Sequence, residues 1–79
     1  MRALLSIERI VNEVVERIRK LGLRDVSLVR LEGDLAGAAH DAVQFHFAKC
    51  AHDTPLAGVE LELVEAAGTD LRLLELEVA

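Results

Sequence analysis

The stretch VSLVRLEGDLAGAAHDAVQFHF, residues 26–47, decides how the rest of this chain can fold. Its first part, Val26 to Leu31, carries branched and leucine side chains on both alternating phases. That pattern predicts a strand covered on parts of both faces. Gly33 marks the exit of the strand, and apolar residues then recur at helical spacing from Ala38 to Ala51. We therefore expect a strand that leads through a short turn into a helix.

The segment before this stretch predicts a second helix. Apolar residues from Leu4 to Leu21 follow the i, i+3, i+4, i+7 spacing of a helix buried on one face. Gly22 stands where a left-handed residue is expected to end a helix. The helix at residues 4–21 is therefore expected to pack one apolar face on the core.

The segment after the stretch predicts two strands. Val59 to Leu63 alternates apolar and acidic residues, and Leu71 to Val78 is a second apolar-rich run. The phase of that run shifts between Leu73 and Leu74, which indicates either a bulge or a strand covered on both sides. Ala66 to Thr69 can supply a turn, so we expect the last two strands to form a hairpin.

The predicted order is α-β-α-β-β. The simplest fold that buries both helical stripes is a two-layer α+β fold, with two helices packed on one face of a three-stranded mixed sheet. A length of 79 residues leaves room for one hydrophobic core. We therefore expect residues 1–79 to form one domain.

Charge and composition exclude several classes of function. Residues 1–30 carry seven Lys or Arg against four acids, and residues 31–79 carry two against ten. The two aromatics lie in the acidic half, which argues against nucleic-acid binding. Neither a targeting segment nor a transmembrane segment is visible, and one cysteine suits a reducing compartment. We expect a cytoplasmic protein without a membrane partner, and a homo-oligomer remains an alternative.

Three residues within one short segment are candidate metal ligands. On a helix, His46 and Cys50 share a face, and His52 lies just beyond, so the three could form an N/S site for a transition metal. The alternative is that Cys50 is a small core residue with His46 at the helix flank and His52 in a loop. We expect His40 to be a surface residue.

The predicted sheet also carries a set of carboxylates. In a hairpin, the exposed face would gather Glu60, Glu62, Glu75 and Glu77. Their mutual repulsion would be relieved if Arg30 or Arg72 intervened. The alternatives are a solvated face, a docking face for a basic partner, or a site for a hard cation. No residues form a catalytic constellation, so we expect no enzymatic activity.

The order of elements and several local patterns resemble the hydrogenase/urease nickel-incorporation family, the HypA type. The similarity spans residues 4–65, and residues from Gly68 onward resemble the closing strand of the family. The matching residues are Val26, Val29, Leu31 and Gly33 in the first strand, Phe45 and Phe47 in the second helix, and Thr54, Leu56, Gly58, Val59 and Leu61 near the next strand.

The chain departs from this family at both of its metal sites. The resemblance implies a nickel site with a histidine at position two, where this sequence has Arg2 followed by Ala3. Arginine offers no lone pair to a metal at physiological pH. Family members also insert two CxxC pairs between the last two strands, whereas Cys50 is the single cysteine here. A structural Cys₄ zinc site is therefore not expected.

The resemblance favours a non-enzymatic adaptor that lacks a resident cofactor. Such a protein would act by contact with a nickel-enzyme subunit or a maturation protein, or as an accessory subunit. One alternative is a metallochaperone that binds a transition metal such as nickel through His46, Cys50 and His52. Another alternative is an unrelated small structural homo-oligomer.

Overall fold

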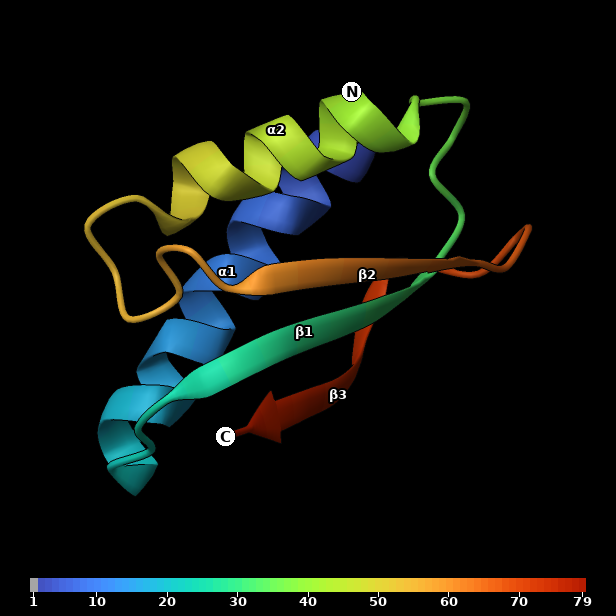
Figure 1. Cartoon of the computed structure of the whole chain (residues 1–79). Helices are drawn as coiled ribbons and strands as arrows, with labels where there is room; N and C mark the ends of the chain where they lie inside the picture. The colour runs from blue at the N-terminus through green and yellow to red at the C-terminus, as the bar shows by residue number, and fades with distance from the viewer. Residues whose placement is uncertain (1) are drawn as a thin grey trace.

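A computed structural model describes residues 2–79, and the burial of side chains from residue 5 onward. It contains two helices and three strands in the predicted order (Figure 1). The elements are α1 (Arg2–Leu21), β1 (Val26–Gly33), α2 (His40–Ala51), β2 (Glu60–Glu65) and β3 (Arg72–Val78). The predicted α+β fold, with two helices and a mixed three-stranded sheet, is confirmed.

The helix α1 forms because its apolar residues make one continuous buried stripe. The buried members are Ile7, Ile10, Val11, Val14, Val15 and Ile18. The helix ends at Gly22, whose φ of 66° is the left-handed conformation that glycine adopts without strain. The N–H of Leu23 then donates to the carbonyl of Ile18 at 3.0 Å, as in a Schellman motif. The predicted end of this helix is therefore confirmed.

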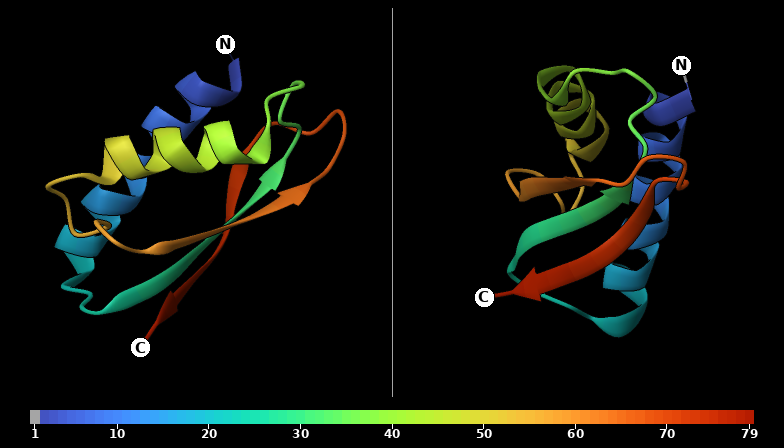
Figure 2. Two further views of the ribbon diagram at one scale, coloured as in Figure 1. Left: turned by 45° about the horizontal axis from the view of Figure 1, so that its top comes forward. Right: turned by 90° about the vertical axis from the view of Figure 1, so that its right-hand side faces the viewer.

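The sheet has the strand order β2-β1-β3, with β1 in the centre. β1 pairs in parallel with β2 and antiparallel with β3. The predicted hairpin between the last two strands is therefore wrong, because β2 and β3 lie on opposite sides of β1 (Figure 2). The central position of β1 also explains why this strand is apolar on both phases.

The loop at residues 66–71 carries the chain across the end of β1 to its other side. The N–H of Ala66 donates to the Gly33 carbonyl at 2.9 Å, and the N–H of Asp34 donates to the Thr69 carbonyl at 2.7 Å. A Cβ at Gly33 would lie 2.4 Å from the Cα of Leu71. Only glycine therefore allows the loop to approach β1 so closely and to place β3 on the far edge.

The strand β3 contains the predicted bulge. Arg30 is opposite Glu75 and Leu31 is opposite Leu73, so Leu74 has no partner in the register. The extra residue changes the phase of the strand and turns the Leu74 side chain outward. The bulge predicted between Leu73 and Leu74 is confirmed.

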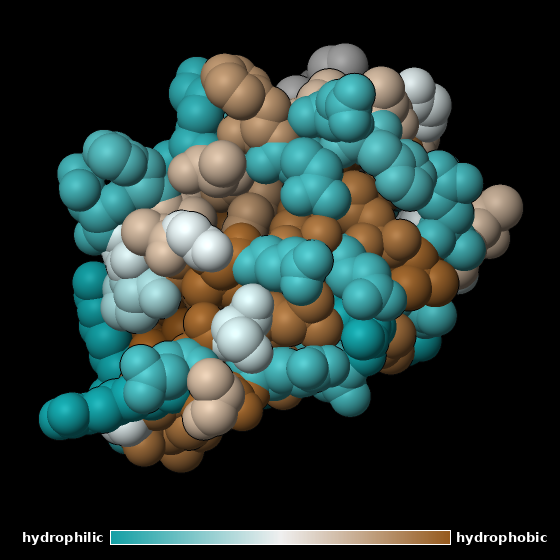
Figure 3. All heavy atoms as spheres, in the orientation of Figure 1, coloured by the Kyte–Doolittle hydropathy of each residue, from teal (hydrophilic) through white to brown (hydrophobic). Residues whose placement is uncertain are grey.

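One core joins both helices to one face of the sheet (Figure 2). Val29 and Leu31 of β1 and Val43 of α2 are fully buried in this core, and Phe47 of α2 is nearly so. Figure 3 shows apolar residues reaching the surface in a band between α2 and the strands. The other face of the sheet is covered by neither helix, so its side chains must be stabilised in another way.

Candidate functional site

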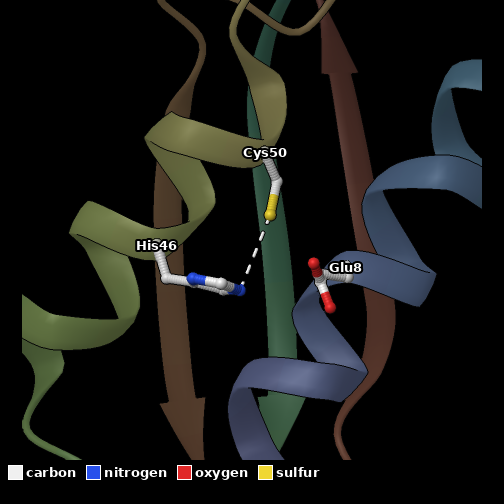
Figure 4. Close-up of side chains that lie close together, drawn as sticks. All are labelled: Glu8, His46 and Cys50. Carbon is white, nitrogen blue, oxygen red and sulfur yellow. Dashed lines mark hydrogen bonds between the residues drawn. The ribbon is translucent and has the colours of Figure 1, made fainter.

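Three side chains with metal-ligating atoms meet where α1 and α2 pack together. The carboxylate of Glu8 and the ring of His46 face the thiol of Cys50 (Figure 4). The ligand atoms of these three residues all lie within 4.8 Å of one another. In the described part of the chain this is the one group of three such residues that could hold a metal ion. We call these three residues the α1–α2 cluster.

The helical spacing of α2 places His46 and Cys50 one turn apart. Val43 and Phe47 form the buried stripe of the helix, and His46 and Cys50 flank that stripe in half-buried positions. The Sγ atom of Cys50 lies 3.6 Å from the Nε2 atom of His46, a hydrogen-bond distance for sulfur. The two side chains therefore hold one another in place without a bound ion.

The environment of Cys50 favours its protonated form. Burial raises the pKa of the Cys50 thiol, the negative charge of Glu8 raises it further, and the ammonium of Lys49 opposes this rise. A cysteine nucleophile needs the opposite shift, because the thiolate is the reactive species. The thiol of Cys50 is therefore poorly suited to nucleophilic catalysis.

The structure does not bring the third predicted ligand, His52, into the cluster. The helix α2 ends at Ala51, and His52 is its C-cap residue with a side chain that is 79% exposed. Its Nε2 atom lies 3.5 Å from a carboxylate oxygen of Asp53. His40 is exposed, as predicted, and its Nε2 atom lies 2.9 Å from the Glu65 carboxylate.

Sequence reasoning missed Glu8. This residue lies three positions before Val11 and seven before Val15, at the margin of the buried stripe of α1. The only local signal in the sequence is that an acidic residue stands at the margin of the apolar stripe. This signal does not indicate which side chains of α2 lie near Glu8. The packing of α1 against α2 supplies that information.

The predicted carboxylates lie on the uncovered face of the sheet, around Arg30. We call this surface the open sheet face; its residues are Leu28, Arg30 and Glu32 of β1, Glu60 and Glu62 of β2, and Arg72, Glu75 and Glu77 of β3. The Nε atom of Arg30 lies 2.9 Å from Glu62, and an Nη atom lies 3.6 Å from Glu77. Arg30 also forms an ion pair with Glu75.

These ion pairs change the acid–base properties of both partners. The hydrogen bond from Arg30 lowers the pKa of the Glu62 carboxyl, and that same bond raises the pKa of Arg30. The guanidinium of Arg30 lies among carboxylates from both β2 and β3. The predicted role of Arg30 in relieving the repulsion is therefore confirmed.

The two positions of the family's nickel motif lie at the start of α1. Arg2 and Ala3 belong to the helix, but their side chains lie outside the described residues. Among residues 2–79, no helix is both long and apolar enough to cross a membrane.

The fold and the cluster define a small α+β protein with three side chains between its helices that could hold a metal ion. Comparison with protein-family models finds no match. The chain is similar to the hydrogenase maturation factor HypA of Geobacter metallireducens, with 40% identity over 65 residues. The aligned region covers 81% of this chain and 57% of that protein, so the chain spans just over half the length of its curated relative. This similarity supports the HypA-type resemblance at the level of the family.

Proposed function

We propose that this chain is a non-enzymatic accessory protein in the maturation of a nickel enzyme and that it acts by protein–protein contact. The observation that carries this proposal is the 40% identity over 65 residues to a hydrogenase maturation factor. That relative is a maturation factor, which is a protein that assists another protein. The partner that we propose is therefore a nickel-enzyme subunit or another maturation protein.

A contact role fits these residues better than nickel delivery through the family's own site. The resemblance implies nickel binding by a histidine at position two, where this sequence has Arg2. It also implies a zinc domain between the last two strands, where the loop at residues 66–71 joins β2 to β3 directly. On this proposal the chain keeps the scaffold of the family without the histidine and cysteine ligands that the resemblance implies.

The open sheet face is the surface that we assign to this contact. The opposite face of the sheet is already buried against α1 and α2. The open sheet face carries five glutamates against Arg30 and Arg72, so it is acidic overall. An acidic surface of this kind fits a basic patch on the partner, and salt should weaken the association.

The test is direct binding between tag-free protein and the nickel-free large subunit of its host's hydrogenase. Calorimetry at low and high salt should show a complex that weakens as salt is added. Glu60→Lys should reduce the affinity, because Glu60 is exposed on the open sheet face and makes no ion pair among the described residues. The matched control Glu16→Lys changes the exposed side of α1 and should leave the affinity unchanged.

Two results would contradict this proposal. One is the absence of a complex both with the large subunit and with the host's hydrogenase maturation proteins. The other is sedimentation that finds only self-association, which would favour the alternative of a structural homo-oligomer.

A further inference from the structure

We propose that Glu8, His46 and Cys50 bind one exchangeable divalent ion of the zinc class at the contact between α1 and α2. The ligands are a carboxylate oxygen, an imidazole Nε2 and a thiolate. The ion would join two helices that pack against each other. The site is separate from the proposed docking face, and a role in protein–protein contact does not require it.

The separation of two ligand atoms already matches a tetrahedral zinc site. Zinc lies about 2.3 Å from a cysteine sulfur and about 2.0–2.1 Å from a histidine nitrogen. At a tetrahedral angle these bond lengths place the two ligand atoms about 3.6 Å apart. The Sγ atom of Cys50 and the Nε2 atom of His46 are 3.6 Å apart. An ion could therefore replace the hydrogen bond with these two ligand atoms at their present separation.

The third ligand needs only a small movement. A tetrahedral site would bring the Glu8 oxygen to about 3.4–3.6 Å from the other two ligand atoms. All three atoms now lie within 4.8 Å of one another, so the carboxylate oxygen would have to approach the other two ligand atoms by up to about 1.4 Å. Glu8 is exposed, and rotation of its side chain can supply this movement.

The set of donors selects the class of ion. Magnesium and calcium prefer sites made of oxygen, and a monovalent copper ion prefers sulfur. One sulfur, one nitrogen and one oxygen suit zinc, and cobalt(II) takes the same sites. Three protein ligands leave a fourth position open to water or to a donor from another molecule, as in zinc sites that exchange ligands. The single cysteine excludes a Cys₄ site and still permits this one.

The charges in the cluster also favour a divalent ion. With the ion bound, one thiolate and one carboxylate balance a charge of +2.

The test is a titration of tag-free protein with cobalt(II), followed by displacement with zinc. We expect one equivalent of cobalt to produce a thiolate-to-cobalt charge-transfer band and intense visible bands typical of tetrahedral cobalt. Zinc should abolish both sets of bands. Cys50→Ser should remove the charge-transfer band. Loss of an outer-shell partner alone weakens metal binding about 10–100-fold, so Glu8→Gln and His46→Gln should weaken it at least as much.

Matched controls separate this site from the arrangement predicted from the sequence. His52→Gln and Glu13→Gln change exposed residues outside the cluster and should leave the cobalt affinity unchanged. Glu8→Gln is the decisive variant, because an exposed residue can be replaced without loss of the fold. Zinc should also raise the midpoint of thermal unfolding of the wild type and not that of Glu8→Gln.

Three outcomes would overturn the proposal. The first is a silent cobalt spectrum for the wild type. The second is unchanged affinity in Glu8→Gln, and the third is a loss of affinity in His52→Gln equal to that in His46→Gln. Neither the expected result nor these outcomes depends on whether a hydrogenase subunit binds the open sheet face.

Discussion

The two faces of the sheet are built on different physical principles, although the same strand supplies the centre of both. On the covered face, Val29 and Leu31 are fully buried against the helices. On the open sheet face, Arg30 lies between them in sequence and forms ion pairs with glutamates from both neighbouring strands. Apolar burial stabilises the covered face, whereas charge pairing stabilises the open face. This division lets a short chain keep one stable core and still present a charged surface.

The comparison predicts that the largest loss of stability comes from the covered face. Leu31→Ala should lower the free energy of unfolding by about 2–5 kcal/mol, because it removes a fully buried side chain and leaves a cavity. Urea denaturation followed by circular dichroism measures this loss. The matched control is Leu74→Ala at the bulge, where the side chain is 47% exposed and the cost should stay below about 1 kcal/mol. Equal losses in the two variants would contradict the comparison.

A second prediction concerns the point where the chain crosses the end of β1. Gly33→Ala should cost about 2–4 kcal/mol, because the new Cβ would meet the backbone of Leu71 at 2.4 Å and backbone atoms cannot move aside alone. Gly22→Ala tests the left-handed conformation by itself, since nothing lies within 4 Å of its Cβ. That variant should cost about 1–2 kcal/mol. A Gly33→Ala variant no less stable than Gly22→Ala would show that the close approach is unimportant.

The elements could be predicted from the sequence because their signals are local. Helical periodicity, the glycine after α1 and the phase shift at Leu74 each act within a few residues. The pairing of β3 could not be predicted in the same way. A strand that follows another after a short turn normally pairs with it, and here the approach of Leu71 to Gly33 moves β3 to the other edge.

The candidate site could likewise be predicted only where its residues are close together in the sequence. The spacing of His46 and Cys50 places them on one side of a helix, and the structure has them in contact. Glu8 belongs to another helix, so its position depends on how α1 packs against α2. His52 lies close in sequence but just after the end of α2, and the change in backbone direction there separates it from the cluster.

A third prediction tests the charge pairing on the open sheet face. Arg30→Gln should lower the stability of the fold, because it leaves the glutamates of β2 and β3 without the cation between them. The loss should be smaller than that in Leu31→Ala, because ion pairs on an exposed surface contribute little. The loss should shrink in high salt, which screens the repulsion between carboxylates. The matched control is Arg72→Gln, since Arg72 is more exposed and pairs with Glu32 alone in the described ion pairs. A salt-independent loss in Arg30→Gln would indicate lost packing.

The smallest expected effect is the pH dependence of that ion pair. Arg30 holds the pKa of Glu62 below its usual value of about 4.5, so the ionised carboxylate is favoured by folding. The stability that this ion pair contributes is fully present above the usual pKa of the carboxyl group. It is lost as the pH falls through the lowered pKa of the folded state. The stability difference between the wild type and Arg30→Gln should therefore be largest near neutral pH and decrease below about pH 4.5. NMR titration of the Glu62 carboxyl carbon gives the direct measurement: its midpoint should rise in Arg30→Gln and stay lowered in Arg72→Gln. An unchanged midpoint in Arg30→Gln would mean that Arg30 does not set the acidity of this face.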